Sequence, residues 1–252
     1  HGGIYRDVWM IGKSSVAITD ALEADKVAGG GVFVHFDNIS GKKAEVYVDT
    51  EVHNSGKRTR TVAVETVLVD AGDVPVKRVS QQVKLQAGES KTVRQRFAVR
   101  NPKLWSPDSP YLYRIQSRVK AGHEVLDGGV TRVGIRKAEF KGKDGFWLNG
   151  KPFGQLVGAN RHQDFAYVGN ALPNSQQWRD AKRLRDAGCT IIRVAHYPQD
   201  PAFMDACDEM GLFVIVATPG WQYWNKNPEF AKLVHRNTRE MIRRDRNHPS
   251  VL

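Results

Sequence analysis

The sequence of 252 residues predicts a multidomain protein in which an antiparallel, immunoglobulin-like β-sandwich precedes a parallel β-sheet covered by helices. Two observations support this. Up to about residue 140, apolar and polar residues alternate in short runs separated by turn residues, which is typical of strands with one buried face. Beyond that point, short apolar runs alternate with helical segments, which is typical of parallel strands joined through helices.

The first part contains a series of segments with strand periodicity. Turn residues separate them, for example Asn54-Ser55-Gly56 and Ala87-Gly88-Glu89. No cysteine occurs in this part, so the disulfide of antibody domains is absent. The predicted strands are residues 32–36, 44–49, 61–69, 79–85, 92–99 and 111–119.

The second part reads as strand, helix, strand, helix, strand, helix. Gly188 and Gly211 suit the left-handed residue that ends a helix, and Asp200-Pro201 suits a helix start. The predicted strands are residues 155–159, 190–194 and 212–217, with a further strand beginning at 250, and the predicted helices are residues 175–187, 201–210 and 228–246.

Periodicity alone leaves two arrangements open for the second part, a doubly wound sheet and a (β/α)8 barrel. A glycine-rich phosphate loop after the first strand would favour the doubly wound sheet. The segment there is instead Asn160-Arg161-His162-Gln163-Asp164, which is rich in functional side chains. Barrels place their chemistry at the carboxyl ends of their strands.

Composition excludes several classes of protein. No apolar run approaches the roughly 20 residues needed to span a bilayer, and the formal net charge of +11 is not accompanied by a zinc finger or an aromatic-basic RNA motif. Attraction to an acidic polysaccharide is the weaker reading of this charge. Cys189 and Cys207 are expected to be free thiols. The densest basic patch is predicted to be a solvated helix face and consists of Arg236, Arg239, Arg243, Arg244 and Arg246.

Six segments, in this order, resemble motifs of glycoside hydrolase family 2, the β-galactosidase/β-glucuronidase group. They are Gly3-Ile4-Tyr5-Arg6-Asp7-Val8-Trp9, the run from Asn101 to Tyr113, the run from Gly134 to Pro152, Gly158-Ala159-Asn160-Arg161-His162-Gln163-Asp164, Arg193-Val194-Ala195-His196-Tyr197-Pro198, and Asp245-Arg246-Asn247-His248-Pro249-Ser250-Val251. The resemblance implies that residues 1–12 end a jelly-roll sugar-binding domain, that 13–137 form the sandwich, and that 138–252 are the first part of a (β/α)8 TIM barrel, cut at its fourth strand.

The resemblance also implies a retaining exo-β-glycosidase, with β-galactosidase as the expected activity. Such enzymes need two carboxylates about 5–5.5 Å apart. In the family, the acid/base is the Glu of an Asn-Glu pair after the fourth strand, and the nucleophile follows the seventh strand. No Asn-Glu pair occurs here, so we expect an internal fragment that is inactive by itself. The alternative is a non-catalytic carbohydrate-binding or scaffold portion of a multidomain protein; an unrelated barrel lyase or aldolase is disfavoured because no Schiff-base lysine is evident.

The resemblance assigns candidate site residues to the ends of the first two barrel strands. Arg193 is expected to orient the nucleophile carboxylate and to keep it ionised, unless it makes an ordinary ion pair. His162 and His196 are expected to bind sugar hydroxyls, because imidazole can both donate and accept, unless they only hold their loops. Asn160 and Asp164 are expected to bind hydroxyls or to brace the loop.

The loop after the third strand carries the remaining candidate. Trp221 is expected to stack on a sugar ring, together with Tyr223 and Trp224, unless these rings pack against another domain. This loop lacks the acidic residues that supply magnesium ligands in β-galactosidases. We therefore expect no metal and no cofactor at this loop.

The expected partner is a β-glycoside carbohydrate, with neither nucleic acid nor membrane as a partner, and homo-oligomerisation is left open. The compartment is undetermined, and the periplasm or the cell exterior is slightly favoured over the cytoplasm.

Overall fold

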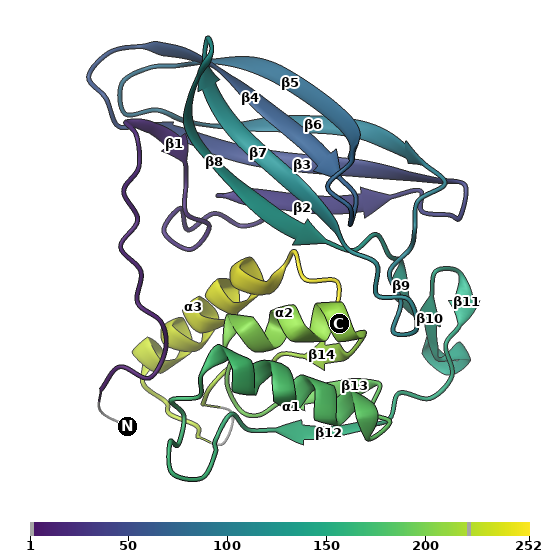
Figure 1. The fold of residues 1–252 in the computed structure, drawn as a ribbon. Coiled ribbons are helices and arrows are strands. Elements are labelled where there is room, and N and C mark those ends of the chain that lie inside the picture. Colours follow the sequence, from purple (N-terminus) through teal and green to yellow (C-terminus); the bar gives the residue numbers. More distant parts are fainter. Residues whose placement is uncertain (1–2, 221–222) are drawn as a thin grey trace. The chain divides into compact units, whose positions relative to one another are not determined.

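The computed structural model describes residues 3–220 and 223–252 (Figure 1). The chain forms two compact units, and each is built from separate stretches of sequence. The sandwich unit comprises residues 11–104 and 111–136. The barrel unit comprises residues 1–10, 105–110 and 137–252. The assignment of residues 1–12 to the end of a jelly-roll domain stays a prediction.

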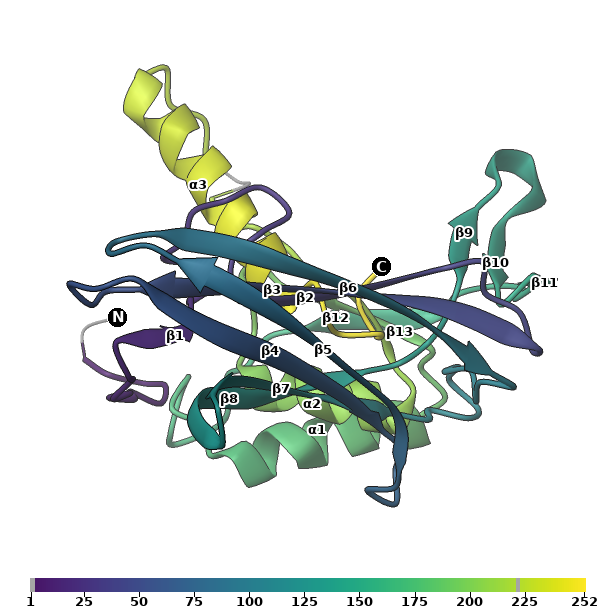
Figure 2. The ribbon, with the colours of Figure 1, turned by 90° about the horizontal axis from the view of Figure 1, so that it is seen from above.

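The sandwich unit consists of two antiparallel sheets, which lie one over the other in Figure 2. In the first sheet, β3 pairs with β1, β2 and β6, and in the second the order is β5-β4-β7-β8. The strands are β1 (Val16–Ile18), β2 (Val32–Asp37), β3 (Lys43–Asn54), β4 (Arg60–Val69), β5 (Pro75–Leu85), β6 (Ser90–Arg100), β7 (Tyr113–Ala121) and β8 (Glu124–Val133).

Alternation along the strands explains the sandwich core. In β6, Val93, Gln95, Phe97 and Val99 are buried while the residues between them are exposed, because successive side chains point to opposite faces. The buried side of both sheets is mostly valine, leucine and isoleucine. The fold class predicted from the sequence is therefore confirmed for this part.

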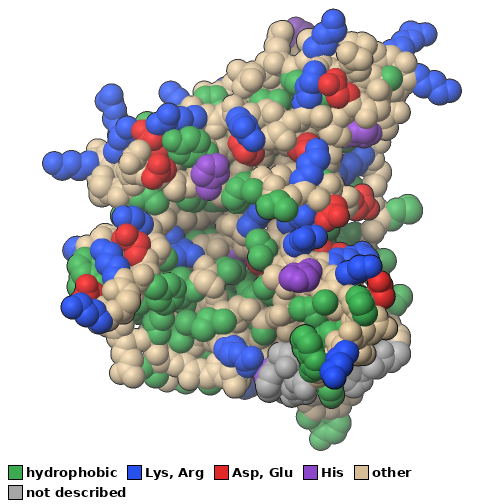
Figure 3. Space-filling view, turned by 180° about the vertical axis from the view of Figure 1, so that it is seen from behind, with side chains coloured by type: hydrophobic (Ala, Val, Ile, Leu, Met, Phe, Trp, Pro, Cys, Tyr) green, Lys and Arg blue, Asp and Glu red, His purple; other side chains and the backbone are tan. Residues whose placement is uncertain are grey.

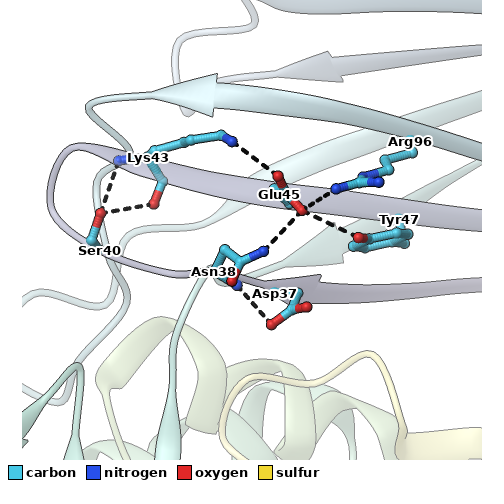
Figure 4. A network of polar contacts seen from close by, with 7 residues as sticks. All are labelled: Asp37, Asn38, Ser40, Lys43, Glu45, Tyr47 and Arg96. Atoms are coloured by element: carbon cyan, nitrogen blue, oxygen red, sulfur yellow. Dashed lines mark hydrogen bonds and ion pairs between the residues drawn. The ribbon is translucent and has the colours of Figure 1, made fainter.

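The outer face of the first sheet carries a polar network around Glu45 (Figure 4). The Glu45 carboxylate accepts hydrogen bonds from Lys43 Nζ at 2.9 Å, from Asn38 Nδ2 at 3.1 Å, from the Tyr47 hydroxyl at 3.2 Å and from Arg96. The contacts with Lys43 and Arg96 in particular lower the pKa of Glu45 to about 2, since they stabilise its charged form.

The barrel unit contains a parallel sheet in the order β12-β13-β14. Helices α1 and α2 both cover the same face of this sheet (Figure 1). Strands in sequence order with helices on one side are typical of a barrel, whereas a doubly wound sheet has helices on both sides. The elements are β12 (Gly158–Arg161), α1 (Asn174–Asp186), β13 (Ile191–Val194), α2 (Pro201–Met210), β14 (Phe213–Ile215) and α3 (Pro228–Asp245); a small antiparallel sheet of β9 (Ala138–Phe140), β10 (Phe146–Leu148) and β11 (Lys151–Pro152), with a 3₁₀ turn at Gly142–Asp144, precedes them.

The helix ends follow the residues that the sequence indicated. Gly188 follows α1 with a φ of 85°, and Gly211 caps α2 with a φ of 73°, a conformation that glycine adopts without steric cost. The Asp200 side chain accepts a hydrogen bond from the amide of Ala202 and so caps the start of α2.

One strand prediction in the barrel unit was misplaced, and another is met by a single bridge at the predicted position. The first strand begins at Gly158 rather than at Gln155, and it continues through Asn160 and Arg161, which the alternation placed in a loop. The predicted fourth strand is, in the described residues, a single bridge in which Val251 pairs in parallel with Val214.

The usual burial of large aromatic side chains predicts that Trp105 and Trp147 both lie in the core, but the two have different surroundings. Trp105 is 0% exposed and contacts Phe213 edge-on at a centroid distance of 5.4 Å, so its prediction is confirmed. Trp147 is only half-buried, and the ammonium of Lys141 lies 3.7 Å from its ring centroid. Its prediction was wrong, because a cation-covered indole at the surface is also a favourable arrangement.

The predicted solvated arginine face on α3 is only partly present. Arg236 is exposed and forms an ion pair with Glu240. Arg243, in contrast, is buried, and the bidentate ion pair between Arg244 and Asp245 is largely buried. Elsewhere, Lys and Arg side chains are interspersed with Asp and Glu on the face drawn in Figure 3. Cys189 and Cys207 are free thiols, as predicted. No described helix is both long and apolar enough to cross a membrane.

Candidate active site

Asn160, Arg193 and Ile215 form a row across the carboxyl ends of the three parallel strands. Asn160 is in register with Arg193, and Arg193 is in register with Ile215. Because side chains alternate along strands, the three share the face opposite to the helices. Their neighbours Arg161 and Val194 are buried on the helix side. The row therefore lies on the inner face of the barrel sheet, at the carboxyl ends of the strands, where barrels place their chemistry.

Arg193 and two histidines lie together at this edge. Arg193 Nη1 is 3.2 Å from His196 Nδ1, and the rings of His196 and His162 meet edge-on with centroids 5.1 Å apart. Partial burial, the charge of Arg193 and the proximity of His162 lower the pKa of His196. At neutral pH its imidazole is therefore uncharged and can both donate and accept a hydrogen bond.

Tyr197 and Asp164 extend the site beyond the histidines. The Tyr197 ring lies 6.3 Å from that of His162. Burial, and after it the negative charge of Asp164, raise the pKa of Tyr197, which places the Asp164 carboxylate within electrostatic reach of the phenol. Asp164 itself is exposed. The structure thus brings Asn160, His162, Asp164 and His196 to the same edge as Arg193, while their roles stay predictions.

Trp221 lies outside the described residues, so its stacking role stays a prediction. Its described neighbours Tyr223 and Trp224 are exposed. They line a hollow of about 390 Å³ together with Phe230 and the beginning of α3.

Comparison with known proteins decides the family. Residues 31–136 match the domain described as "Glycosyl hydrolases family 2", and residues 139–252 match "Glycosyl hydrolases family 2, TIM barrel domain". The chain belongs to glycoside hydrolase family 2. The resemblance drawn from the sequence motifs is therefore confirmed, and with it the sandwich and the beginning of a TIM barrel.

Relatives within family 2 extend well beyond this chain. A β-galactosidase of Thermoanaerobacter pseudethanolicus is 35% identical over 251 residues, which are 99% of this chain and 31% of that protein. The crystal structure of a β-glucuronidase from Bacteroides uniformis superposes with a TM-score of 0.91 at 30% identity, covering 100% of this chain and 30% of that one. A family 2 member from Bacteroides cellulosilyticus gives a TM-score of 0.85 at 32% identity, covering 95% of this chain and 30% of that one. The chain thus spans about a third of the length of the relatives it matches.

One cluster among the described residues of this family 2 chain has donors that a metal ion could use, namely Asp205, Asp208 and His248. The Asp208 carboxylate already has internal partners. Its Oδ2 lies 2.6 Å from His248 Nδ1, and its Oδ1 accepts a hydrogen bond from the Ser250 amide at 3.0 Å. These bonds attach the segment after α3 to α2, so the cluster is accounted for without an ion.

Several polar residues next to the site were not predicted from the sequence to have a role. Arg6, Arg161, Gln163 and Gln199 had no assigned role, although the first three lie within the quoted motifs and Gln199 directly follows one. For Arg161, strand alternation predicts a buried position, because this residue follows Asn160 in the same strand and must point to the opposite, helix-covered face. A buried arginine requires several acceptors, which predicts a network there.

Proposed function

We propose that this chain supplies part of the sugar-binding site of a retaining exo-β-glycosidase with β-galactosidase activity. The observation that carries the proposal is the group formed by Asn160, Arg193 and His196 at the carboxyl ends of adjacent parallel strands. The names of the relatives, which include β-galactosidases and β-glucuronidases, support a β-glycoside as the substrate.

Each residue has a chemical task in this proposal. Arg193 makes no ion pair with a carboxylate among the described residues and is half-buried. A fixed guanidinium there would hold the nucleophile carboxylate of the enzyme ionised and oriented. The uncharged ring of His196, with His162 beside it, would bind a sugar hydroxyl.

This chain contains no Asn-Glu pair, so other parts of the complete protein would supply the acid/base and the nucleophile. The 252 residues alone are therefore expected to be inactive. The non-catalytic alternative, a carbohydrate-binding or scaffold portion, predicts sugar binding without turnover in the complete protein as well.

The test uses the complete protein that carries this chain, with a panel of aryl β-glycosides that includes the galactoside and the glucuronide. We expect β-galactoside hydrolysis with retention of the anomeric configuration. Arg193→Ala should lower kcat/KM by about 10²–10³-fold, comparable to the loss of one transition-state donor.

Arg185→Ala is the matched control, because Arg185 bonds the Pro107 carbonyl and Asp108 away from the strand ends, and it should leave kcat/KM within about twofold. Turnover of none of the glycosides, or an Arg193→Ala variant as active as the control, would contradict the proposal.

A further inference from the structure

We propose that Arg6 and Arg161 are positioning residues that hold the loops after β12 and β13 against each other, so that His162 and His196 keep their mutual geometry. The significance of this geometry for catalysis rests on the proposed function. The first loop begins at His162, directly after Arg161, and the second comprises residues 195–200.

Arg161 contacts several elements on the helix-covered side of the parallel sheet. Its side chain is 5% exposed, and its guanidinium donates to Gln199 Oε1 at 2.6 Å, to Gln177 Oε1 at 2.8 Å and to Asp180 Oδ2 at 2.7 Å. The guanidinium carbon lies 4.0 Å from the ring centroid of Phe203. One cation thus joins the end of β12 to the second loop, to α1 and to α2.

Arg6 joins the same two loops through a second set of contacts. Its Nη2 donates to Gln163 Oε1 at 3.2 Å in the first loop and to the Pro198 carbonyl at 2.7 Å in the second. Gln163 is wholly buried, and its Oε1 also accepts a hydrogen bond from the Asp200 amide at 3.1 Å. The residues around Arg6 are exposed, including Val8. Among the described residues, the hydrogen bonds of Arg6 therefore hold this segment against the two loops.

Both contacts act next to the histidines. Gln163 directly follows His162, and Gln199 is three residues beyond His196 in the same short loop. Arg244 fixes Gln199 further, because its Nη1 donates to the Gln199 carbonyl at 2.9 Å. Charge-assisted bonds of this kind are stronger and more directional than neutral ones. Loss of either arginine would therefore let the loops separate and let His196 move away from Arg193 and His162.

The test measures the histidine rings directly in the 252-residue chain, so that it needs no turnover and can fail independently of the proposed function. The readouts are the nuclear Overhauser contact between the His162 and His196 rings and the pH titration of His196 in histidine-labelled protein, assigned through His162→Asn and His196→Asn. In Arg6→Ala we expect the ring contact to fall to less than half and the titration midpoint of His196 to rise toward its ordinary value, since the ring becomes more hydrated and more distant from Arg193.

Two conservative variants refine the result. Arg6→Lys keeps the charge but offers a single point donor, so it should restore part of the ring contact. Arg161→Lys cannot reach its three acceptors at once and should lose the contact as Arg6→Ala does. Arg185→Ala serves as the control, which should leave both readouts unchanged even if it lowers the melting temperature. Unchanged histidine readouts in Arg6→Ala and Arg161→Lys, or equal changes in the Arg185→Ala control, would overturn the proposal.

Discussion

Replacing Asp208 by asparagine should destabilise the chain at acidic pH much more than at alkaline pH. The substitution preserves shape, and its amide oxygen can still accept the hydrogen bond from the Ser250 amide. It removes the charge that faces His248 Nδ1 at 2.6 Å. Burial acts to lower the pKa of His248, but the hydrogen bond and the charge of Asp208 outweigh this effect, so the pKa of His248 is raised.

The sign of the pH dependence follows from the raised pKa. A histidine whose pKa is higher in the folded state contributes stability that is fully present below its unfolded value of 6.5 and is lost as the pH rises through the folded value. At pH 5.5, Asp208→Asn should therefore lower the free energy of unfolding by about 1.5–3 kcal/mol, the range for a hydrogen bond to a charged group. Above the folded pKa of His248 the difference from wild type should shrink, because the neutral ring can instead accept from the asparagine amide.

Urea unfolding of both proteins between pH 5 and pH 9 measures this difference. Asp186→Asn is the control, because the Lys182–Asp186 pair is exposed, with 66% and 60% of the two side chains accessible, and should change stability by less than about 1 kcal/mol. A difference between wild type and Asp208→Asn that stays constant across this pH range would refute the linkage to His248.

Three further predictions concern the two units. Glu45→Gln should cost stability above pH 4.5, and in acid unfolding the difference from wild type should shrink as the pH falls through about 2, the folded pKa of Glu45. A difference as large at pH 2 as above pH 4.5 would contradict this. Gly211→Ala should lower the free energy of unfolding by more than about 3 kcal/mol, because its Cβ would lie 2.2 Å from the Pro107 carbonyl oxygen at a φ of 73°. Gly188→Ala should cost only about 1 kcal/mol, because its Cβ would meet nothing within 4 Å. Equal losses of stability for the two variants in denaturant unfolding would exclude the clash. Trp105→Phe removes the hydrogen bond from Nε1 to the Asp208 carbonyl at 2.8 Å and should cost about 1–3 kcal/mol in the same assay, and an unchanged unfolding midpoint would show that this bond contributes nothing.

The sandwich strands were predictable wherever one face is buried. Alternation located β2 to β7 to within a few residues, because burial forces a period of two. The same criterion missed β8, in which Gly128 and Gly129 interrupt the pattern and half of the residues are exposed. The three-residue strand β1 is too short to show a period.

The site was predictable only where polar residues follow an apolar strand. His162 and His196 come directly after recognisable strands, and both lie at the predicted edge. The boundary of β12 was wrong because Asn160 and Arg161 are polar residues inside a strand, a local conflict that functional sites commonly contain. Arg6 could not be predicted, since its contact with Gln163 spans 157 positions and no local pattern encodes such a distance.

The discontinuous course of the barrel unit limits how the chain can be divided. A cut at residue 137 would appear to separate sandwich from barrel, yet it would detach residues 105–110 from the unit to which they belong. The βα half would then lose Trp105, whose indole contacts Phe213 and bonds the end of α2. Recombinant dissection or domain shuffling within this family should therefore transplant the two units together, because a βα half cut at residue 137 lacks Trp105, which is part of its own interior.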